Sequence, residues 1–279
     1  MSSLHQLLQE KLGLVEEITS VQGGDVGTSF RIVSQNREYF CKVYKESDHQ
    51  EMIRSEMDGL AQLSEAVDVP EVIDSFFTDG FSGFIMEYID SAVSLPEAGG
   101  ESIARLHQFE GEEFGYVRST FIGPIRIHNT PSDSWADFWW EHRILPLYHN
   151  VIAEANDAIR KGMKWIEQNR DELFSKESPR LLHGDLWSGN FIYRKSGSPC
   201  FIDPSVYYGH REMDIGMMLL FGGFRDELIT YLDINPLEKG WEKRMFWSQL
   251  YPLMVHWCLF GGAYAMRIEQ GFRERGITT

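Results

Sequence analysis

The sequence of 279 residues contains little cysteine, and none of it forms a ligand or disulfide pattern. Its three cysteines, Cys41, Cys200 and Cys258, are odd in number and widely spaced, without a CxxC pair. Disulfide-rich secreted domains and structural zinc sites both depend on clustered cysteines, so neither class fits this chain. We therefore expect a protein of the reducing cytoplasm.

The sequence also lacks a long apolar run. The longest apolar stretches, 215–224 and 253–266, are interrupted by glycines or by His256. Both fall short of the roughly 20 apolar residues that a membrane helix requires. The first fourteen residues have no basic start followed by an apolar core, and their pattern predicts an amphipathic helix rather than a signal peptide. No membrane partner is expected.

Basic residues are scarce relative to acidic ones, with 26 Lys and Arg against 42 Asp and Glu and a net charge of −16. Nucleic acids and anionic membranes attract basic surfaces, so neither is expected as a partner. A cationic substrate suits this balance better, although an acidic surface that only keeps the protein solvated is the alternative interpretation. An anionic nucleotide bound to such a chain needs local cations, namely a lysine and metal ions.

No internal repeat or low-complexity tract is present, so solenoids and disordered linkers are excluded. Periodicity predicts a helix, a small set of strands and one principal helix (48–66) within residues 1–90, and mainly helices, among them 97–108 and 135–170, within residues 91–279. The pattern predicts an α+β chain of two lobes, a small β-rich lobe over residues 1–90 and a larger helical lobe over residues 91–279.

The chemistry is concentrated between residues 181 and 203. Asp185 and Asn190 lie in a loop flanked by apolar runs, and a predicted hairpin then leads to Asp203. The spacing Asp-x4-Asn matches the kinase catalytic loop, with His183 at the histidine position of that motif. Phosphoryl transfer from ATP needs an aspartate for the attacking hydroxyl and oxygen ligands for Mg²⁺. We predict Asp185 as the catalytic base and Asn190 and Asp203 as metal ligands.

An alternative interpretation of these aspartates is purely structural. Asp185 would cap a turn and Asp203 would cap a helix, which are common roles for this residue type. The kinase interpretation is favoured because the Asp-x4-Asn spacing occurs together with the hairpin and with a lysine and a glutamate upstream.

The upstream features are a lysine on a strand and a glutamate on a helix. Strand alternation puts Lys42 on the same face as Phe40 and Tyr44. Glu56 lies on the apolar face of the helix 48–66. A carboxylate that points toward the core needs a cationic partner, so we predict a Lys42–Glu56 pair that positions ATP. The alternative is a solvent-exposed lysine and a glutamate in a surface network.

Two further segments are candidate ATP contacts. Gly23, Gly24 and Gly27 form a glycine-bearing turn before the lysine strand, where backbone N–H groups would cover phosphates. Glu87 and Tyr88 end an apolar run at the predicted lobe boundary, where the backbone would meet the adenine edge. An ordinary hairpin turn and an interior strand are the respective alternatives.

With these residues identified, the chain resembles the fructosamine-3-kinase, or ketosamine kinase, family, a relative of the aminoglycoside phosphotransferase and choline kinase group. The resemblance covers nearly the whole chain. It implies a two-lobed, protein-kinase-like fold, with residues 1–90 as the ATP-binding lobe and residues 91–279 as the catalytic and substrate-binding lobe. It is sharpest at HGDLWSGN (183–190), IDPSVYYGHRE (202–212) and FGGF (221–224). The resemblance implies that ATP, with Mg²⁺, phosphorylates the 3-hydroxyl of a sugar joined to an amine, and that the unstable product then releases the amine.

The resemblance adds further site residues. It implies that Trp187, beside the base, stacks on the substrate, with packing as the alternative. It implies that His210 and Arg211 line the sugar pocket or else brace it. Asp214 resembles the helix aspartate that, together with His183, supports the catalytic loop backbone, and a helix N-cap is the alternative.

Some features depart from protein kinases or stay open. Pro204 follows the metal aspartate, so a DFG-type switch is absent and extended peptides are not expected as substrates. Other acceptors, such as an aminoglycoside or a choline-like alcohol, and a nucleotide-binding pseudokinase are the alternatives. The sequence does not indicate which sugar is phosphorylated. The amine is either free or a glycated lysine on a protein, and the chain is either a monomer or a homodimer.

Overall fold

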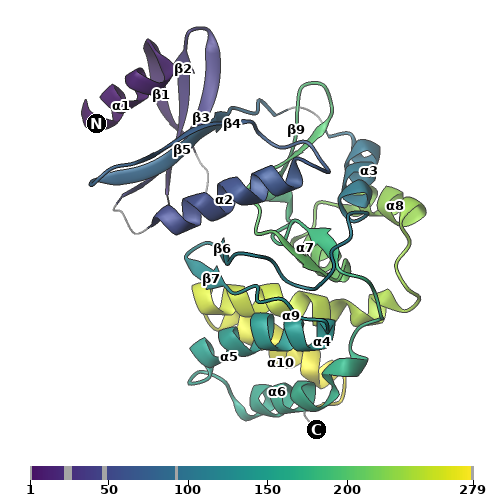
Figure 1. Cartoon of the computed structure of the whole chain (residues 1–279). Coiled ribbons are helices and arrows are strands. Elements are labelled where there is room, and N and C mark those ends of the chain that lie inside the picture. The colour runs from purple at the N-terminus through teal and green to yellow at the C-terminus, as the bar shows by residue number, and fades with distance from the viewer. Residues whose placement is uncertain (1, 22–26, 46–48, 92–93, 278–279) are drawn as a thin grey trace. The chain divides into compact units, whose positions relative to one another are not determined.

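The computed structural model describes residues 2–21, 27–45, 49–91 and 94–277 (Figure 1). Contacts divide the chain into two compact units. Unit 1 comprises residues 1–95 and 191–203, and unit 2 comprises residues 96–190 and 204–279. Residues 191–203 thus pack with the N-terminal part, although they lie within the region predicted as the second lobe. The domain boundaries 1–90 and 91–279 stay a prediction.

Unit 1 is built on an antiparallel sheet of five strands in the order β1-β2-β3-β5-β4. Its elements are α1 (Ser2–Leu12), β1 (Val15–Val21), β2 (Thr28–Ser34), β3 (Arg37–Lys45), α2 (Gln50–Leu63), β4 (Val72–Phe77), β5 (Phe81–Glu87), β9 (Phe191–Tyr193) and β10 (Pro199–Phe201). Gln35 and Asn36 adopt φ of 51° and 63° and connect β2 to β3 in a two-residue turn. Such left-handed turns match the twist of paired strands and thereby set their register.

Alternation along the strands divides the core of unit 1 between the two faces of the sheet. Leu8 of α1 packs with Cys41 and Ile85 in one cluster, whereas Ile53 of α2 packs with Phe84 in another. Each helix therefore covers one face. Lys42 lies between Cys41 and Val43 on β3, so its side chain projects on the α2 side.

Unit 2 is mainly helical, and α9 is its longest helix (Figure 1). Its elements are α3 (Pro96–Leu106), β6 (Thr120–Ile122), β7 (Ile125–Ile127), α4 (Trp135–Trp139), η2 (Trp140–Ile144), α5 (Leu145–Val151), α6 (Asp157–Asn169), η3 (Arg170–Glu172), β8 (Arg180–Leu182), η4 (Ser188–Asn190), β11 (Tyr207–Gly209), α7 (Glu212–Phe221), α8 (Arg225–Ile234), α9 (Trp241–Phe260) and α10 (Ala263–Glu274). Helix α9 packs against α7, α10 and α5 and buries the main core. Among the described residues, no helix is both long and apolar enough to cross a membrane.

The continuous helix predicted over 135–170 is wrong in its interior. A π-helical turn (η2) follows α4, and the helix stops at residue 151 before α6 begins. Asn156 is the N-cap of α6 and accepts a hydrogen bond from the Ile159 N–H at 3.0 Å. This cap starts a separate helix, a local signal that apolar periodicity does not contain.

The strand pairing around the predicted catalytic loop also differs from a single hairpin. Strands β9 and β10 form a hairpin with Phe191 opposite Phe201, but β8, which precedes the loop, pairs with β11. Because β11 lies beyond the hairpin in sequence, this pairing is non-local and leaves no local sequence signal. The loop after β8 is therefore anchored to the segment that leads into α7.

Helices α3 and α8 approach so closely that a glycine is needed between them. A Cβ atom added at Gly100 would lie 2.4 Å from the backbone oxygen of Glu227. Gly100→Ala should destabilise the protein by about 1–3 kcal/mol, because a backbone cannot move aside as a side chain can. Urea denaturation measures this loss. Gly262→Ala is the matched control, since nothing lies within 4 Å there, and a stability loss equal to that of Gly100→Ala would contradict the packing argument.

Candidate active site

In unit 1, Lys42 is held between two carboxylates. Its Nζ donates to Glu56 Oε1 at 2.9 Å and Oε2 at 3.0 Å, and to Asp203 Oδ1 at 3.1 Å. Lys42 is 5% exposed and Glu56 is 8% exposed, so both charges are removed from water. Burial lowers the pKa of Lys42, but Asp203 and Glu56 together raise it well above its usual value, so the ammonium stays charged. The structure thus brings the predicted lysine and glutamate together, with Asp203 as a third member.

Asp203 has an unusual backbone conformation, with φ of +51°. A non-glycine residue in the left-handed region costs energy and is found where the surroundings hold it there, often at functional sites. The conformation turns the chain directly after β10. The carboxylate that contacts Lys42 therefore comes from a constrained turn.

The segment at Glu87 and Tyr88, predicted to contact adenine, is tied to the β9–β10 hairpin by Arg194. Its guanidinium forms ion pairs with Glu87 and with Asp68, and the pairing with Glu87 lowers the pKa of that carboxyl. The backbone N–H of Glu87 donates to Glu71 O at 2.8 Å, and that of Tyr88 donates to Glu38 O at 3.4 Å. These two N–H groups are engaged within unit 1, so an adenine contact in this segment would use other backbone atoms.

Of the predicted glycine turn, Gly23 and Gly24 lie outside the described residues. Gly27 is described, directly before β2. A Cβ atom there would lie 3.1 Å from Val43 O and 3.3 Å from the Tyr44 ring. The role of these glycines in ATP binding stays a prediction.

In unit 2, the catalytic loop backbone is held by Asp214 from the first turn of α7. The carboxylate of Asp214 accepts hydrogen bonds from the His183 N–H at 2.8 Å and from the Gly184 N–H at 3.0 Å. The N-cap residue of α7 is Arg211 rather than Asp214. Of the two interpretations of Asp214, the contacts with His183 and Gly184 are those of backbone support.

Within the loop, Asp185 and Asn190 are in contact. The Asn190 amide Nδ2 donates to Asp185 O at 2.9 Å and to Asp185 Oδ2 at 3.0 Å. Asn190 is 5% exposed, so these bonds are shielded from water. The loop thereby fixes the orientation of the Asp185 carboxylate. Strand β9 begins at Phe191, directly after Asn190, and β10 ends at Phe201, two residues before Asp203. Because Phe191 pairs with Phe201, Asn190 and Asp203 flank the same end of the β9–β10 hairpin along the chain.

Gly184 allows the loop to pass close to β11. Its φ is +82°, and a Cβ atom there would lie 1.9 Å from the backbone oxygen of Ser205. No other residue fits that conformation and that distance without a shift. Gly184 stands where the protein-kinase motif has arginine. In this chain the glycine lets the backbone at residue 184 pass close to the backbone of Ser205.

The side chain of Trp187 is 41% exposed, and its ring meets that of Phe221 edge-on with 6.5 Å between centroids. A Cβ atom on Gly189 would lie 2.2 Å from this indole, so Gly189 leaves room for it. Trp187 is therefore held by neighbours but open to a ligand. Its role in substrate binding stays a prediction.

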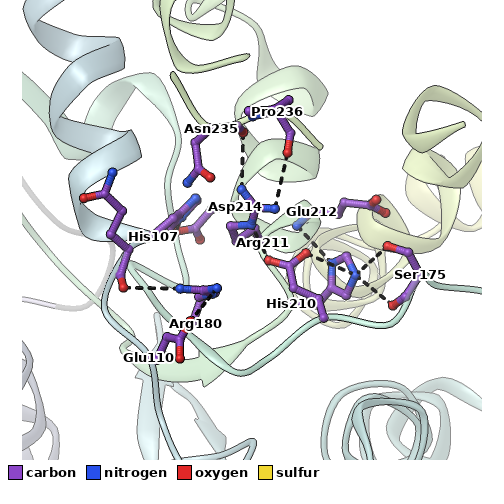
Figure 2. A network of polar contacts seen from close by, with 12 residues as sticks. His107, Glu110, Ser175, Arg180, His210, Arg211, Glu212, Asp214, Asn235 and Pro236 are labelled. Atoms are coloured by element: carbon purple, nitrogen blue, oxygen red, sulfur yellow. Dashed lines mark hydrogen bonds and ion pairs between the residues drawn. The ribbon is translucent and has the colours of Figure 1, made fainter. Parts of the chain in front are cut away.

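His210 and Arg211 make the contacts of the bracing alternative (Figure 2). His210 is fully buried; its Nδ1 accepts from the Glu212 N–H at 3.2 Å, and its Nε2 donates to Ser175 O at 3.2 Å. Burial lowers the pKa of His210, although Glu177 opposes this effect. Arg211 pairs with Glu177 and donates to Asn235 O at 3.2 Å. Both side chains thus join the segment before α7 to neighbouring loops.

One supporting residue escaped sequence reasoning. His107, at the end of α3, lies 3.2 Å from Asp214 Oδ2 through Nε2 and 2.9 Å from the Tyr231 hydroxyl through Nδ1. It is fully buried and orients the Asp214 carboxylate. Its partners are more than 100 positions away along the chain, so no local spacing points to it.

The comparisons with known proteins agree along the whole chain. The fructosamine kinase family model matches residues 1–275. A probable ketoamine kinase of Enterococcus faecium is 35% identical over 95% of this chain and 97% of its own length. A chloroplastic protein-ribulosamine 3-kinase of Arabidopsis thaliana is 32% identical over 92% of this chain and 82% of its own.

Solved structures give the same result. The crystal structure of a putative fructosamine-3-kinase from Thermobifida fusca has a TM-score of 0.85 and 30% identity, covering 98% of both chains. A thermostable mutant of an aminoglycoside phosphotransferase has a TM-score of 0.67 at 16% identity, covering 99% of this chain and 100% of its own, which shows the fold alone. The predicted α+β, protein-kinase-like fold is confirmed.

Asp214→Asn should destabilise unit 2 by about 1–3 kcal/mol. An amide in place of the carboxylate keeps one acceptor for the two N–H groups of His183 and Gly184 and turns a donor toward the other. Urea denaturation measures the loss. Asp233→Asn, an exposed position on α8, is the matched control and should leave stability unchanged. Equal stability of the two variants would show that Asp214 does not hold the loop.

Proposed function

This chain belongs to the fructosamine kinase family and is a phosphotransferase with an alcohol group as acceptor, and from this we propose how its residues transfer phosphate from ATP to a ketosamine. The acceptor is the 3-hydroxyl of a sugar joined to an amine, as in fructosamines and ribulosamines. The observation that carries the proposal is the catalytic loop, in which Asp214 holds the backbone and Asn190 orients Asp185.

Lys42 positions ATP in this proposal. Kinases use a strand lysine for the α- and β-phosphates and a helix glutamate to hold it. Glu56 contacts the Lys42 ammonium with both carboxylate oxygens, and the burial of both groups strengthens their attraction. The pair therefore keeps a cation ready in an otherwise acidic protein. Gly23, Gly24 and Gly27 cover the phosphates, and the backbone at Glu87 and Tyr88 meets the adenine.

Asp185 acts on the acceptor hydroxyl. It orients the hydroxyl and takes its proton while the phosphoryl group is transferred. Because Asn190 holds Asp185 Oδ2, the carboxylate does not need to be ordered when the substrate arrives. Such preorganisation is a main source of catalysis in phosphoryl transfer, where the protein contributes little covalent chemistry.

The proposed metal ligands have the chemistry that Mg²⁺ requires. Asn190 and Asp203 offer amide and carboxylate oxygens. The cluster of Lys42, Glu56 and Asp203 has one ammonium for two carboxylates, which leaves it with a net negative charge. Among the described residues there is no cluster of three or more His, Cys, Asp or Glu side chains that would form an all-protein site. Mg²⁺ is commonly held by one or two carboxylates together with substrate phosphates. When bound, the ion neutralises charge on the transferred phosphoryl group.

Trp187 is the proposed platform for the acceptor. Its indole is partly exposed two residues after the base, and aromatic rings bind the faces of sugars and cationic amines. The net charge of −16 also suits a substrate with a basic amine. A free glycated amine and a glycated lysine on a protein are both compatible with such a platform. His210 and Arg211 brace the segment before α7.

The product is a ketosamine 3-phosphate, whose breakdown returns the amine and thus completes deglycation.

We assign the protein to the cytoplasm, because its three cysteines are unpaired, as expected where thiols stay reduced.

ADP release with Mg-ATP should occur with ribulose-lysine or fructose-lysine and not with kanamycin or choline. Asp185→Asn should lower kcat by about 10²–10⁴-fold, because the base is lost while its hydrogen-bonding shape is kept. ATP affinity of the variant, measured by calorimetry, should match that of the wild type. Turnover on kanamycin or choline alone would keep a kinase and discard the ketosamine, whereas no turnover on any acceptor would favour a pseudokinase.

Asp203→Asn should raise the Mg²⁺ concentration needed for half-maximal activity by at least about 10-fold. The substitution removes a full charge from a site whose ligand is a divalent cation. Activity is titrated with MgCl₂ at saturating ATP. Asp74→Asn, which removes a carboxylate paired with Lys11 elsewhere in unit 1, is the control. An unchanged Mg²⁺ requirement of Asp203→Asn would remove Asp203 from the metal site.

A further inference from the structure

Unit 2 contains a buried arginine that has not yet been given a role. Arg143 is 0% exposed and belongs to the π-helical turn η2. Its guanidinium carbon lies 4.0 Å from the centre of the Tyr207 ring, 4.6 Å from that of Phe138 and 5.4 Å from that of Tyr251. Among the described residues no carboxylate forms an ion pair with it. Aromatic faces therefore take the place of a counter-ion.

The hydrogen bonds of Arg143 fix the orientation of one amide. Its Nη1 donates to His128 O at 2.9 Å, and its Nη2 donates to Asn129 Oδ1 at 2.5 Å. With Oδ1 turned toward the guanidinium, the other side of the amide is a donor. Asn129 Nδ2 donates to Thr120 Oγ1 at 3.1 Å.

The chain of contacts continues from Thr120 to the catalytic loop. Thr120 Oγ1 also accepts a hydrogen bond from Ser205 Oγ at 3.0 Å. The Ser205 N–H in turn donates to His183 O at 2.9 Å, and Ser205 O is the atom that limits Gly184. Asn129, Thr120 and Ser205 are 3%, 1% and 2% exposed, so water cannot replace these bonds.

A second route reaches the same glycine through packing. The Tyr207 ring lies under the Arg143 guanidinium. Its Cε1 atom is 3.3 Å from the place that a Cβ atom added at Gly184 would take. Tyr207 also pairs with Leu182 in the β11–β8 ladder. The hydrogen bonds from Arg143 thus end at His183 and the ring packing ends at Gly184, the two residues before Asp185.

We propose that Arg143 is a positioning residue that sets the place of Asp185 through Asn129, Thr120 and Ser205 and through Tyr207. This inference rests on the proposed function, because it assumes that Asp185 is the base. Replacing a buried ionic group by apolar residues often stabilises a protein. The desolvation cost of Arg143 is offset by its hydrogen bonds and by the aromatic faces around it.

Lysine cannot substitute for arginine in this arrangement. The planar guanidinium donates to the His128 carbonyl and to Asn129 while its face covers Tyr207, whereas an ammonium is a compact point charge without a face. Arg143→Lys keeps the charge and removes the geometry. Thr120→Val keeps the shape of its side chain and removes the acceptor shared by Asn129 and Ser205.

The experiment measures kcat and KM for Arg143→Lys and Thr120→Val. Each variant should lower kcat by about 10- to 100-fold, since small displacements of a catalytic group cost that much. KM for ATP should stay within about twofold of the wild type, because Lys42 and Glu56 are untouched. Met163→Ala, in the buried core at α6 and outside the contact chain, is the control for lost stability and should leave kcat unchanged below its melting temperature.

Hydrogen exchange of the loop peptide, residues 181–191, gives a readout without turnover. Both network variants should exchange faster there than the wild type and than Met163→Ala. Wild-type kcat in folded Arg143→Lys and Thr120→Val, or an equal loss in Met163→Ala, would overturn the inference. If the wild type turned over no acceptor, the proposed function would fail, and unchanged loop exchange in the variants would separately refute the positioning role.

Discussion

The carboxylate of Asp214 accepts hydrogen bonds from two successive backbone N–H groups, those of His183 and Gly184, and the arrangement of unit 2 around the catalytic loop depends on this contact. A buried carboxylate is costly unless its acceptors are satisfied, and here two N–H groups and His107 satisfy them. Helix α7 is thereby joined to the loop, and the loop to α3. Asp185 is covalently attached to a backbone that cannot rotate without breaking these bonds.

Unit 1 also buries a charged group whose hydrogen-bonding capacity is satisfied by its neighbours, but here the central group is a cation, Lys42. Lys42 is a buried cation whose cost is offset by Glu56 and Asp203, and the strand alternation of β3 puts it on the side of the sheet covered by α2. Because one ammonium lies between two carboxylates, loss of Lys42 would leave two carboxylates without a cation, whereas loss of either carboxylate leaves one ion pair. Kinases hold Mg-ATP with a lysine, a glutamate and a metal-binding aspartate, which are the roles proposed for these three residues.

Unit 2 buries a connected set of polar side chains within its core. Arg143, Asn129 and Thr120 form a connected series in which each amide or hydroxyl has a defined direction. Directional bonds specify one geometry, whereas apolar contacts tolerate small displacements. His210 and Arg211 act alike, since their partners at Ser175, Glu177 and Asn235 bind the segment before α7 from several sides. In the proposed function, these residues would support the chemistry through the backbone segments that they hold.

The sequence alone was sufficient for the fold class, for the catalytic-loop motif and for the Lys42–Glu56 pairing, because strand and helix periodicity and the Asp-x4-Asn spacing are local patterns. The tertiary structure decided the rest. The β8–β11 pairing, the link from His107 to Asp214 and the series from Arg143 to Ser205 join residues far apart in sequence, and each residue alone looks like any other polar residue. Their roles depend on which partners folding brings within hydrogen-bond distance, which spacing along a chain does not encode.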